Sequence, residues 1–154
     1  MMSDALLQQV LGLTDGMTLQ EQVNQPAVIV PVEKLNFLAK FLANDPNFAF
    51  DMLCDHTAVD WPQENIIELV YQLYSTLHGH SFMICVKVSR EKPLAPSLHQ
   101  IWPIAEWQER EIYDLFGVLY SEHPDLRRLF LADDWKGYPL LKDYKDNFML
   151  GRPW

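Results

Sequence analysis

The side chains best suited to chemistry lie in the last third of the chain, between Trp107 and Tyr144. Three blocks mix basic and acidic residues with aromatics, prolines and glycines: WQEREIYDLFGV, HPDLRRLFLADDW and KGYPLLKDY. Paired carboxylates can act as general acid and base when their environments separate their pKa values. Arginines suit bidentate pairing with carboxylates, either within the chain or on another protein. The sequence therefore leaves two roles for these charges, action on a substrate or contact with a neighbour.

Two acidic pairs would have to carry any hydrolytic reaction, Glu109 with Asp114 and Asp133 with Asp134. Adjacent acids such as the second pair can raise each other's pKa, yet they more often form a solvated turn. A stand-alone carboxylate hydrolase is therefore one alternative, and it requires both acids of one pair in a common cleft.

Motifs for redox cofactors are missing from the sequence, which has no GxGxxG, no glycine-rich phosphate loop and no CxxC. His78 and His80 flank a glycine and could chelate a metal, but no third ligand is nearby in the sequence. Cys54 and Cys85 lie in apolar, strand-like runs, which predicts buried, reduced thiols. We expect no catalytic, cofactor-binding or metal site in this chain.

Composition indicates one folded, acidic domain. The chain has 154 residues, of which 49% are hydrophobic, and it contains neither repeats nor low-complexity tracts. Its formal net charge of −9 would repel a polyphosphate backbone, so nucleic acid is not expected as a partner. No uncharged apolar run approaches the ~18 to 20 residues that span a bilayer, and the N-terminal stretch lacks the basic residues of a secretory signal.

Periodicity predicts a helix, a strand and a second helix over 3–12, 26–32 and 33–44. Alternating residues predict strands over 48–61, 66–77 and 81–89. The segment 66–77 also fits a helical stripe. We favour a strand there, because the turn-like HGHS joins it to the evident strand SFMICVKVS.

Pro93 and Pro96 end the sheet region. Ser97 is a candidate N-cap for a short helix through Ile101, and a longer helix is predicted over 104–116, closed by Gly117. Beyond it we expect an extended arm with one helical turn near 125–130. The fold class is α+β, a single domain with a mainly antiparallel sheet covered by helices. The α/β domain spans 1–118, and an extended, charged docking arm spans 119–154.

The predicted helix 104–116 places Glu106, Arg110 and Asp114 four residues apart on one face. Such a face is either solvated, with intrahelical ion pairs, or a docking surface, and the spacing leaves both open. Arg127 and Arg128 cannot both face the same way. One could hold the arm to the domain while the other reaches a partner.

Three segments together resemble a known family: FDMLCDHTAVDWP (50–62), PSLHQIWPIAEWQEREIYDLFGV (96–118) and HPDLRRLFLADDWKGYPLLKDY (123–144). They are similar to the C subunit, or 30 kDa subunit family, of the proton-translocating NADH-quinone oxidoreductase, the respiratory complex I, in its stand-alone form. The resemblance implies a non-catalytic structural and assembly subunit of the peripheral arm. Its complex transfers electrons from NADH to quinone and couples this to proton translocation.

The resemblance also implies the surroundings of the chain. Its partners would be the large quinone-site subunit, of the D type, and adjacent iron–sulfur subunits. The assembled complex would use NADH, FMN, iron–sulfur clusters and quinone, none of them held by this chain. The protein would lie at the cytoplasmic face of the cell membrane, held peripherally through the complex. The equivalent subunit of a membrane-bound hydrogenase or a ferredoxin- or F420-dependent complex is the alternative.

Carried over position by position, the family's signature residues would form the partner interface: Glu109, Arg110, Glu111, Asp114, Gly117, His123, Pro124, Asp125, Leu126, Arg127, Arg128, Gly137, Pro139, Lys142 and Asp143. Two positions depart from the family pattern. Leu141 stands where the family usually has arginine, and Glu122 where it usually has glycine. An ion pair at 141 is therefore not carried over.

Overall fold

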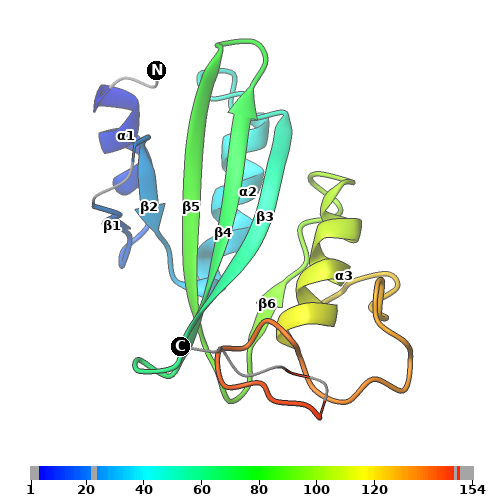
Figure 1. Cartoon of the computed structure of the whole chain (residues 1–154). Coiled ribbons are helices and arrows are strands. Elements are labelled where there is room, and N and C mark those ends of the chain that lie inside the picture. Colours follow the sequence, from blue (N-terminus) through cyan, green and yellow to red (C-terminus); the bar gives the residue numbers. More distant parts are fainter. Residues whose placement is uncertain (1–3, 22–23, 148, 150–154) are drawn as a thin grey trace.

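The main sheet has five strands, in the order β1, β2, β5, β4 and β3 (Figure 1). The computed structural model describes residues 4–21, 24–147 and 149. The strands are β1 (Thr18–Leu19), β2 (Ala27–Ile29), β3 (Met52–Trp61), β4 (Ile66–Ser75) and β5 (His80–Ser89). Strand β2 runs parallel to β5, whereas the other neighbours are antiparallel.

The central strand β4 shows why the long strands form. Its alternate residues Ile67, Leu69, Tyr71 and Leu73 are at most 1% exposed, so they build one face of the core. The strand prediction for 66–77 is therefore confirmed, and the helical alternative is wrong. Gly79, at φ +63°, completes the turn to β5.

Strand β3 departs from simple alternation. Its pairing with β4 shifts register between Leu53 and Asp55, so the side chains change phase at this bulge. Leu53 and His56 are buried, whereas Cys54 is exposed. The prediction of a buried Cys54 thiol is thus wrong, and the corresponding prediction for Cys85 is confirmed.

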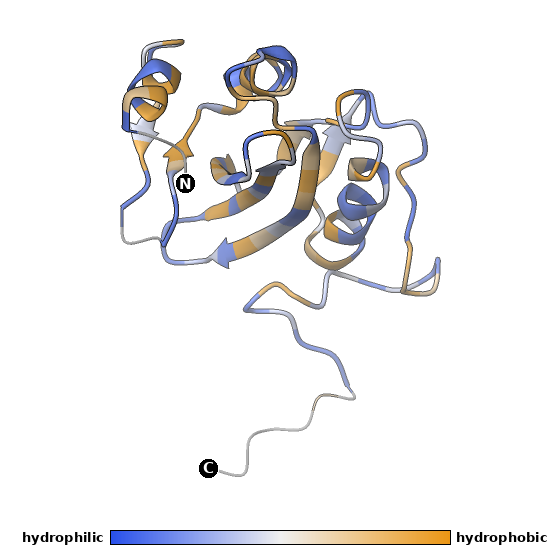
Figure 2. Ribbon diagram, turned by 90° about the horizontal axis from the view of Figure 1, so that it is seen from above, coloured by the Kyte–Doolittle hydropathy of each residue, from blue (hydrophilic) through white to orange (hydrophobic). Residues whose placement is uncertain are grey.

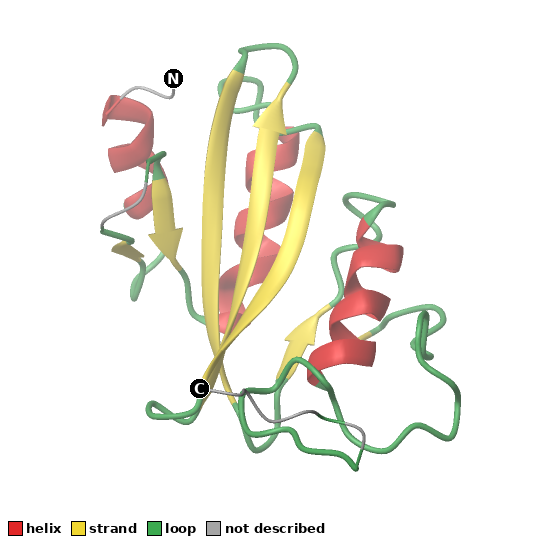
Figure 3. Cartoon of the chain, viewed as in Figure 1, coloured by secondary structure: helices red, strands yellow, loops and turns green. Residues whose placement is uncertain are grey.

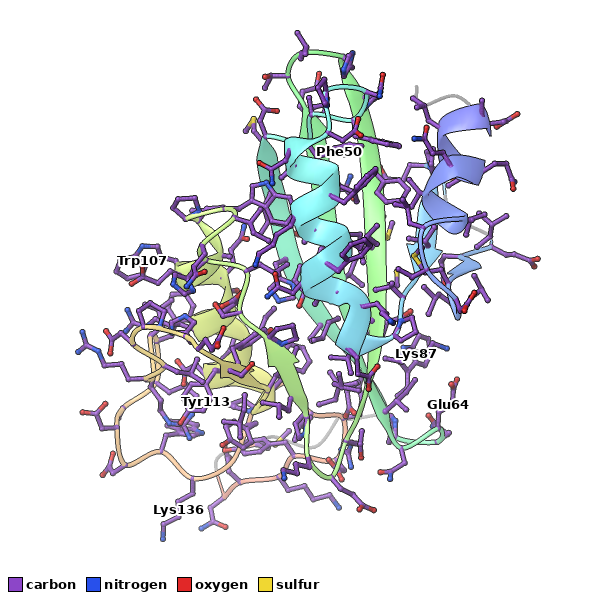
Figure 4. The ribbon with its side chains drawn as sticks, turned by 180° about the vertical axis from the view of Figure 1, so that it is seen from behind. Phe50, Glu64, Lys87, Trp107, Tyr113 and Lys136 are labelled. Carbon is purple, nitrogen blue, oxygen red and sulfur yellow. The ribbon has the colours of Figure 1, made fainter. Side chains whose placement is uncertain are left out.

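Two helices cover the same side of the sheet (Figures 2 and 3). They are α1 (Asp4–Leu11) and α2 (Leu35–Asn44), the latter preceded by the 3₁₀ turn η1 (Val32–Lys34). Helix α2 buries the face that carries Leu35, Leu38, Ala39 and Leu42 against the strands. Figure 4 shows Phe50 beside one end of α2, where its carbonyl accepts a 2.9 Å hydrogen bond from Trp102 Nε1.

Helix α3 (Ala105–Phe116) lies beside β3, at the edge of the sheet (Figure 1). It ends as predicted at Gly117, which is left-handed with φ +79°. Two short parallel strands flank it, β6 (Leu94–Pro96) and β7 (Leu119–Ser121). The pairing of β7 with β6 therefore attaches the first residues of the predicted arm to the domain.

The short helix predicted from Ser97 to Ile101 is wrong, since these residues make one turn only. The Ser97 hydroxyl and the Leu98 amide donate to Glu109 of α3 instead of starting a helix. Pro103 also disfavours a helical conformation in the preceding residue.

Residues 122–147, which we call the arm, contain neither helix nor strand (Figure 3). The helical turn predicted near 125–130 is wrong, because the amides of Leu129 to Leu131 bind a carboxylate of α3. The α+β class with a mainly antiparallel sheet and an extended arm is confirmed. Residues 148 and 150–154 of the predicted arm lie outside the described part. In that described part, none of the helices is both long and apolar enough to cross a membrane.

Candidate partner interface

The arm passes the C-terminal end of α3 and then runs to the lower end of the sheet, where Lys142 and Asp143 contact Asp60 and Arg90 (Figure 1). Most of the residues predicted at the interface belong to this arm or to α3. Their contacts divide into three clusters, centred on the carboxylates of Asp114, Asp60 and Glu109.

Asp114 fixes the first part of the arm. Its side chain is fully buried, and Oδ2 accepts hydrogen bonds from the amides of Leu129, Phe130 and Leu131 at 3.0, 2.7 and 3.0 Å. Arg128 Nη1 donates to Oδ1 at 2.9 Å. Burial alone would raise the pKa of Asp114, but these donors outweigh it and hold the pKa below its ordinary value. The carboxylate is therefore charged and fully engaged inside the chain.

Arg128 extends this cluster along the arm. Its Nη2 donates to the carbonyls of Trp135 at 2.9 Å and Gly137 at 3.2 Å, and its guanidinium lies 5.4 Å from the centre of the Tyr138 ring. One arginine thus links α3 to two later points of the arm. The planar guanidinium, with its several donors, suits this role better than a lysine would.

Arg110 faces the same junction. It is 5% exposed, and it donates to the carbonyls of Arg127 and Arg128 at 3.2 and 3.1 Å, with Trp107 stacked 5.0 Å away. The four-residue spacing predicts Arg110 between two carboxylates of its own helix. In the structure its guanidinium binds the arm's main chain, and Asp114 pairs with Arg128. This helix face is therefore covered by the arm.

Asp60, on the core face of β3, fixes the end of the arm. Its buried carboxylate accepts from Arg90 Nε at 2.7 Å and from the amide of Lys142 at 2.8 Å. Arg90 also reaches Asp143, at 2.5 Å. Burial would raise the pKa of Asp60, but Arg90 and the Lys142 amide lower it below its ordinary value. Sequence reasoning missed Asp60 and Arg90, although an acid on the apolar side of a strand is a usable signal.

Glu109 forms a third buried cluster, at the start of the arm. Its carboxyl accepts from Ser97 Oγ at 2.5 Å and the Leu98 amide at 2.7 Å, and it lies 3.8 Å from His123 Nε2. His123 Nε2 donates to the Glu106 carbonyl, and its Nδ1 accepts from the Asp125 amide. Burial raises the pKa of Glu109 to about 7, against the opposing effect of its two donors. This cluster joins α3, the 97–99 turn and the arm.

The remaining predicted residues have simpler surroundings. Leu126 and Leu141 pack against the core, so the departure at 141 is an apolar contact. Arg127 and Asp125 form an exposed ion pair at 2.8 Å. Glu111 and Lys142 line a pocket of about 370 Å³ between β3, α3 and the arm. Pro124 and Gly137 are exposed, and Pro139 is half-buried.

Gly117 allows the arm to approach α3 closely. A Cβ atom at this position would lie 2.5 Å from Cε2 of Tyr138. The left-handed backbone and this contact both require glycine.

The hydrolytic and metal alternatives gain no support from this geometry. Glu109 and Asp114 have different partners, and neither carboxylate lines any of five pockets formed by the described residues. Asp133 and Asp134 are exposed. Nowhere in the described ranges do three or more His, Cys, Asp or Glu side chains come together as a metal site.

Comparison with protein families gives a match over residues 28–147 to the family described as the respiratory-chain NADH dehydrogenase 30 Kd subunit. The C subunit of the NADH-quinone oxidoreductase of Moorella thermoacetica is 39% identical over 142 residues, which are 92% of this chain and 95% of that protein. A fused C/D subunit of the same enzyme from Phocaeicola vulgatus is 41% identical over 77% of this chain, which spans only 22% of the fused protein.

Two solved structures share the fold. A chain of an archaeal respiratory membrane complex, the membrane-bound sulfane sulfur reductase, has a TM-score of 0.78 and 27% identity, covering 92% of this chain and 84% of its own. A trypsin-resistant fragment of Nqo5 has a TM-score of 0.66 and 28% identity, covering 79% of this chain and 97% of its own.

Proposed function

Because this chain belongs to the respiratory-chain NADH dehydrogenase 30 kDa subunit family, we propose that it is a structural subunit without catalytic residues of its own. Its complex would be a complex I-like NADH-quinone oxidoreductase that transfers electrons from NADH to quinone and couples this to proton translocation. The observation that carries the proposal is the arm, an irregular segment held in one place by Asp114 and Asp60. An ordered segment without regular structure suits docking on a partner.

The partner proposed for the arm is the large quinone-site subunit of the D type. The fused C/D relative supports it, because one polypeptide there carries both names. The predicted interface from Glu109 to Asp143 is proposed to serve this contact, some residues directly and others by holding the arm. Adjacent iron–sulfur subunits are proposed as further neighbours.

In this proposal NADH, FMN, iron–sulfur clusters and quinone belong to other subunits. The chain is proposed to sit at the cytoplasmic face of the membrane, held through the complex. It would contribute to turnover by assembly and by keeping its neighbours in position.

A second candidate follows from the archaeal structural neighbour. Its TM-score of 0.78 makes the equivalent subunit of another membrane-bound respiratory complex a specific alternative. Such complexes include the hydrogenases and the ferredoxin- or F420-dependent enzymes.

Purification of the tagged chain from solubilised membranes of its own host tests both candidates. We expect a D-type subunit and iron–sulfur subunits in equimolar amounts, with NADH-dependent quinone reduction. A nickel-containing or sulfur-reducing partner set would favour the second candidate. Recovery of the chain alone would overturn both.

A further inference from the structure

Three large apolar side chains of the arm face solvent, although the arm's main chain is fixed. Phe130 is 65% exposed, Leu140 is 48% exposed and Trp135 is 38% exposed. The amide of Phe130 binds Asp114, the carbonyl of Trp135 binds Arg128, and the amide of Leu140 donates to the Leu115 carbonyl at 3.0 Å. The chain thus orders the backbone at each position and leaves the side chain uncovered.

All three anchoring groups belong to the end of α3 or to Arg128, which is bound there. The three residues therefore lie near the C-terminal end of this helix. Residues 132–137 between them are all exposed. Figure 4 shows Lys136 of this stretch pointing away from the domain.

We propose that Phe130, Trp135 and Leu140 make the direct contact with the D-type partner, and that the buried charges act only by holding the arm in place. This inference rests on the proposed function. It reverses the expectation from the sequence, in which charged side chains of α3 and the arm contact the partner directly. Asp114, Arg110 and Glu109 are at most 5% exposed, so a partner cannot reach them without first displacing the arm.

Charge distribution favours a partner surface of low net charge. Residues 1–118 contain six basic and fifteen acidic residues, whereas 119–147 contain five basic and six acidic ones. The arm is therefore nearly neutral on a strongly acidic chain. Aromatic side chains held on an ordered backbone are typical of interface residues that dominate affinity, because less conformational entropy is lost on binding.

The fused relative favours the D-type subunit as the occupant over a second copy of this chain. A fusion gives the two parts in a fixed ratio and keeps them together. A second copy would instead make the isolated chain dimeric through these side chains.

The test replaces Phe130, Trp135 and Leu140 with serine, singly and together, in the tagged chain expressed in its host. Leu77→Ser is the matched control, because Leu77 is 72% exposed in the β4–β5 turn, which lies at the opposite end of the sheet from the arm (Figure 1). Hydrogen exchange at the amides of Leu129 and Leu131 reports whether the arm keeps its place. The recovered D-type subunit is measured per mole of tagged chain.

We expect at least tenfold less D-type subunit with the triple variant, a smaller loss with Phe130→Ser alone, and no loss with Leu77→Ser. Arm exchange should stay as in the wild type. Equal recovery with the triple variant, or a wild-type chain that dimerises through these residues, would overturn the inference alone. Failure of the wild-type chain to recover any D-type subunit would overturn the proposed function.

Discussion

The Asp114 carboxylate and the Arg128 guanidinium lie 2.9 Å apart across the junction between α3 and the arm, and the aspartate side chain is fully buried. The same carboxylate receives three consecutive arm amides. Such a cluster keeps a segment without helix or strand in a defined place. The arm is therefore part of the folded domain even though its sequence resembles a loop.

Asp114→Ala should release the first part of the arm. It leaves Arg128 unpaired and removes the acceptor for three amides, and breaking a buried pair costs about 3 to 5 kcal/mol. Hydrogen exchange at Leu129, Phe130 and Leu131 should accelerate by roughly a hundredfold or more. Asp125→Ala is the control, because its pair with Arg127 is exposed, and it should leave these rates unchanged. Equal effects of the two substitutions would show that Asp114 does not hold the first part of the arm.

Asp60→Ala should release the other end of the arm. Lys142 would lose its amide acceptor, and Arg90 would keep only the exposed Asp143. Limited trypsin digestion should then cut after Lys142 and Lys145 on the order of ten times faster, since cleavage follows local opening.

Glu64→Ala is the matched control for this digestion. Glu64 pairs with Lys87 on the surface at 3.9 Å, near the lower end of the sheet in Figure 4. Trypsin should cleave the Glu64→Ala variant in the same pattern and at the same rate as the wild type. A digestion rate for Asp60→Ala equal to the control would show that Asp60 does not hold the arm.

Glu109→Gln should change how stability depends on pH. The pKa of Glu109 is raised from an ordinary 4.5 to about 7 by burial. Below pH 4.5 the carboxyl is protonated in both folded and unfolded chains. Between pH 4.5 and 7 only the unfolded chain releases the proton, so stability falls as pH rises, by roughly 3 kcal/mol in total.

Glutamine cannot ionise, so the variant should gain stability relative to the wild type between pH 5 and pH 8. Urea unfolding at these two values measures the change. Asp60 and Asp114 have lowered pKa values and lose their contribution only at more acid pH, outside this window. If the variant and the wild type differed in unfolding free energy by the same amount at pH 5 and at pH 8, burial would not raise the pKa of Glu109.

Gly117→Ala should destabilise the chain more than Gly79→Ala. Both glycines have positive φ, so both substitutions cost roughly 1 to 2 kcal/mol in backbone strain. Only at Gly117 would the new Cβ meet a ring, that of Tyr138, whereas at Gly79 the nearest atom is 4.0 Å away. The extra cost should be about 1 to 3 kcal/mol, and Tyr138→Ala should relieve part of it. Equal unfolding free energies for the two glycine variants would exclude the clash.

The sequence predicted the parts of the fold that depend on local patterns. Alternation over 66–77 and the following turn residues were enough for the β4–β5 hairpin. Gly117 was enough to predict the residue at which α3 ends. Both signals act within a few residues and do not depend on the rest of the chain.

Predictions failed where a distant partner decides the local structure. Cys54 is exposed because the bulge in β3 changes the phase of its side chains. Ser97 starts no helix because its hydroxyl donates to Glu109, twelve residues later. Asp60 was missed because its partners Arg90 and Lys142 lie thirty and eighty-two residues away.

The surroundings of the interface residues also depend on partners that are distant in the sequence. Local spacing placed Arg110 and Asp114 on a charged helix face, and it could not show that the arm would cover that face. The set taken from the resemblance stays a prediction as an interface. Its buried members now have a defined structural environment within the chain.

We propose that this chain assembles a complex and does no chemistry itself. The most direct test is Arg128→Gln, with two quantities measured in membranes of the host: the amount of assembled complex and the NADH-quinone turnover per assembled complex. We expect less complex, because the arm loses its link between Asp114, Trp135 and Gly137, and unchanged turnover in the complex that remains. A normal amount of complex with lost turnover would contradict it.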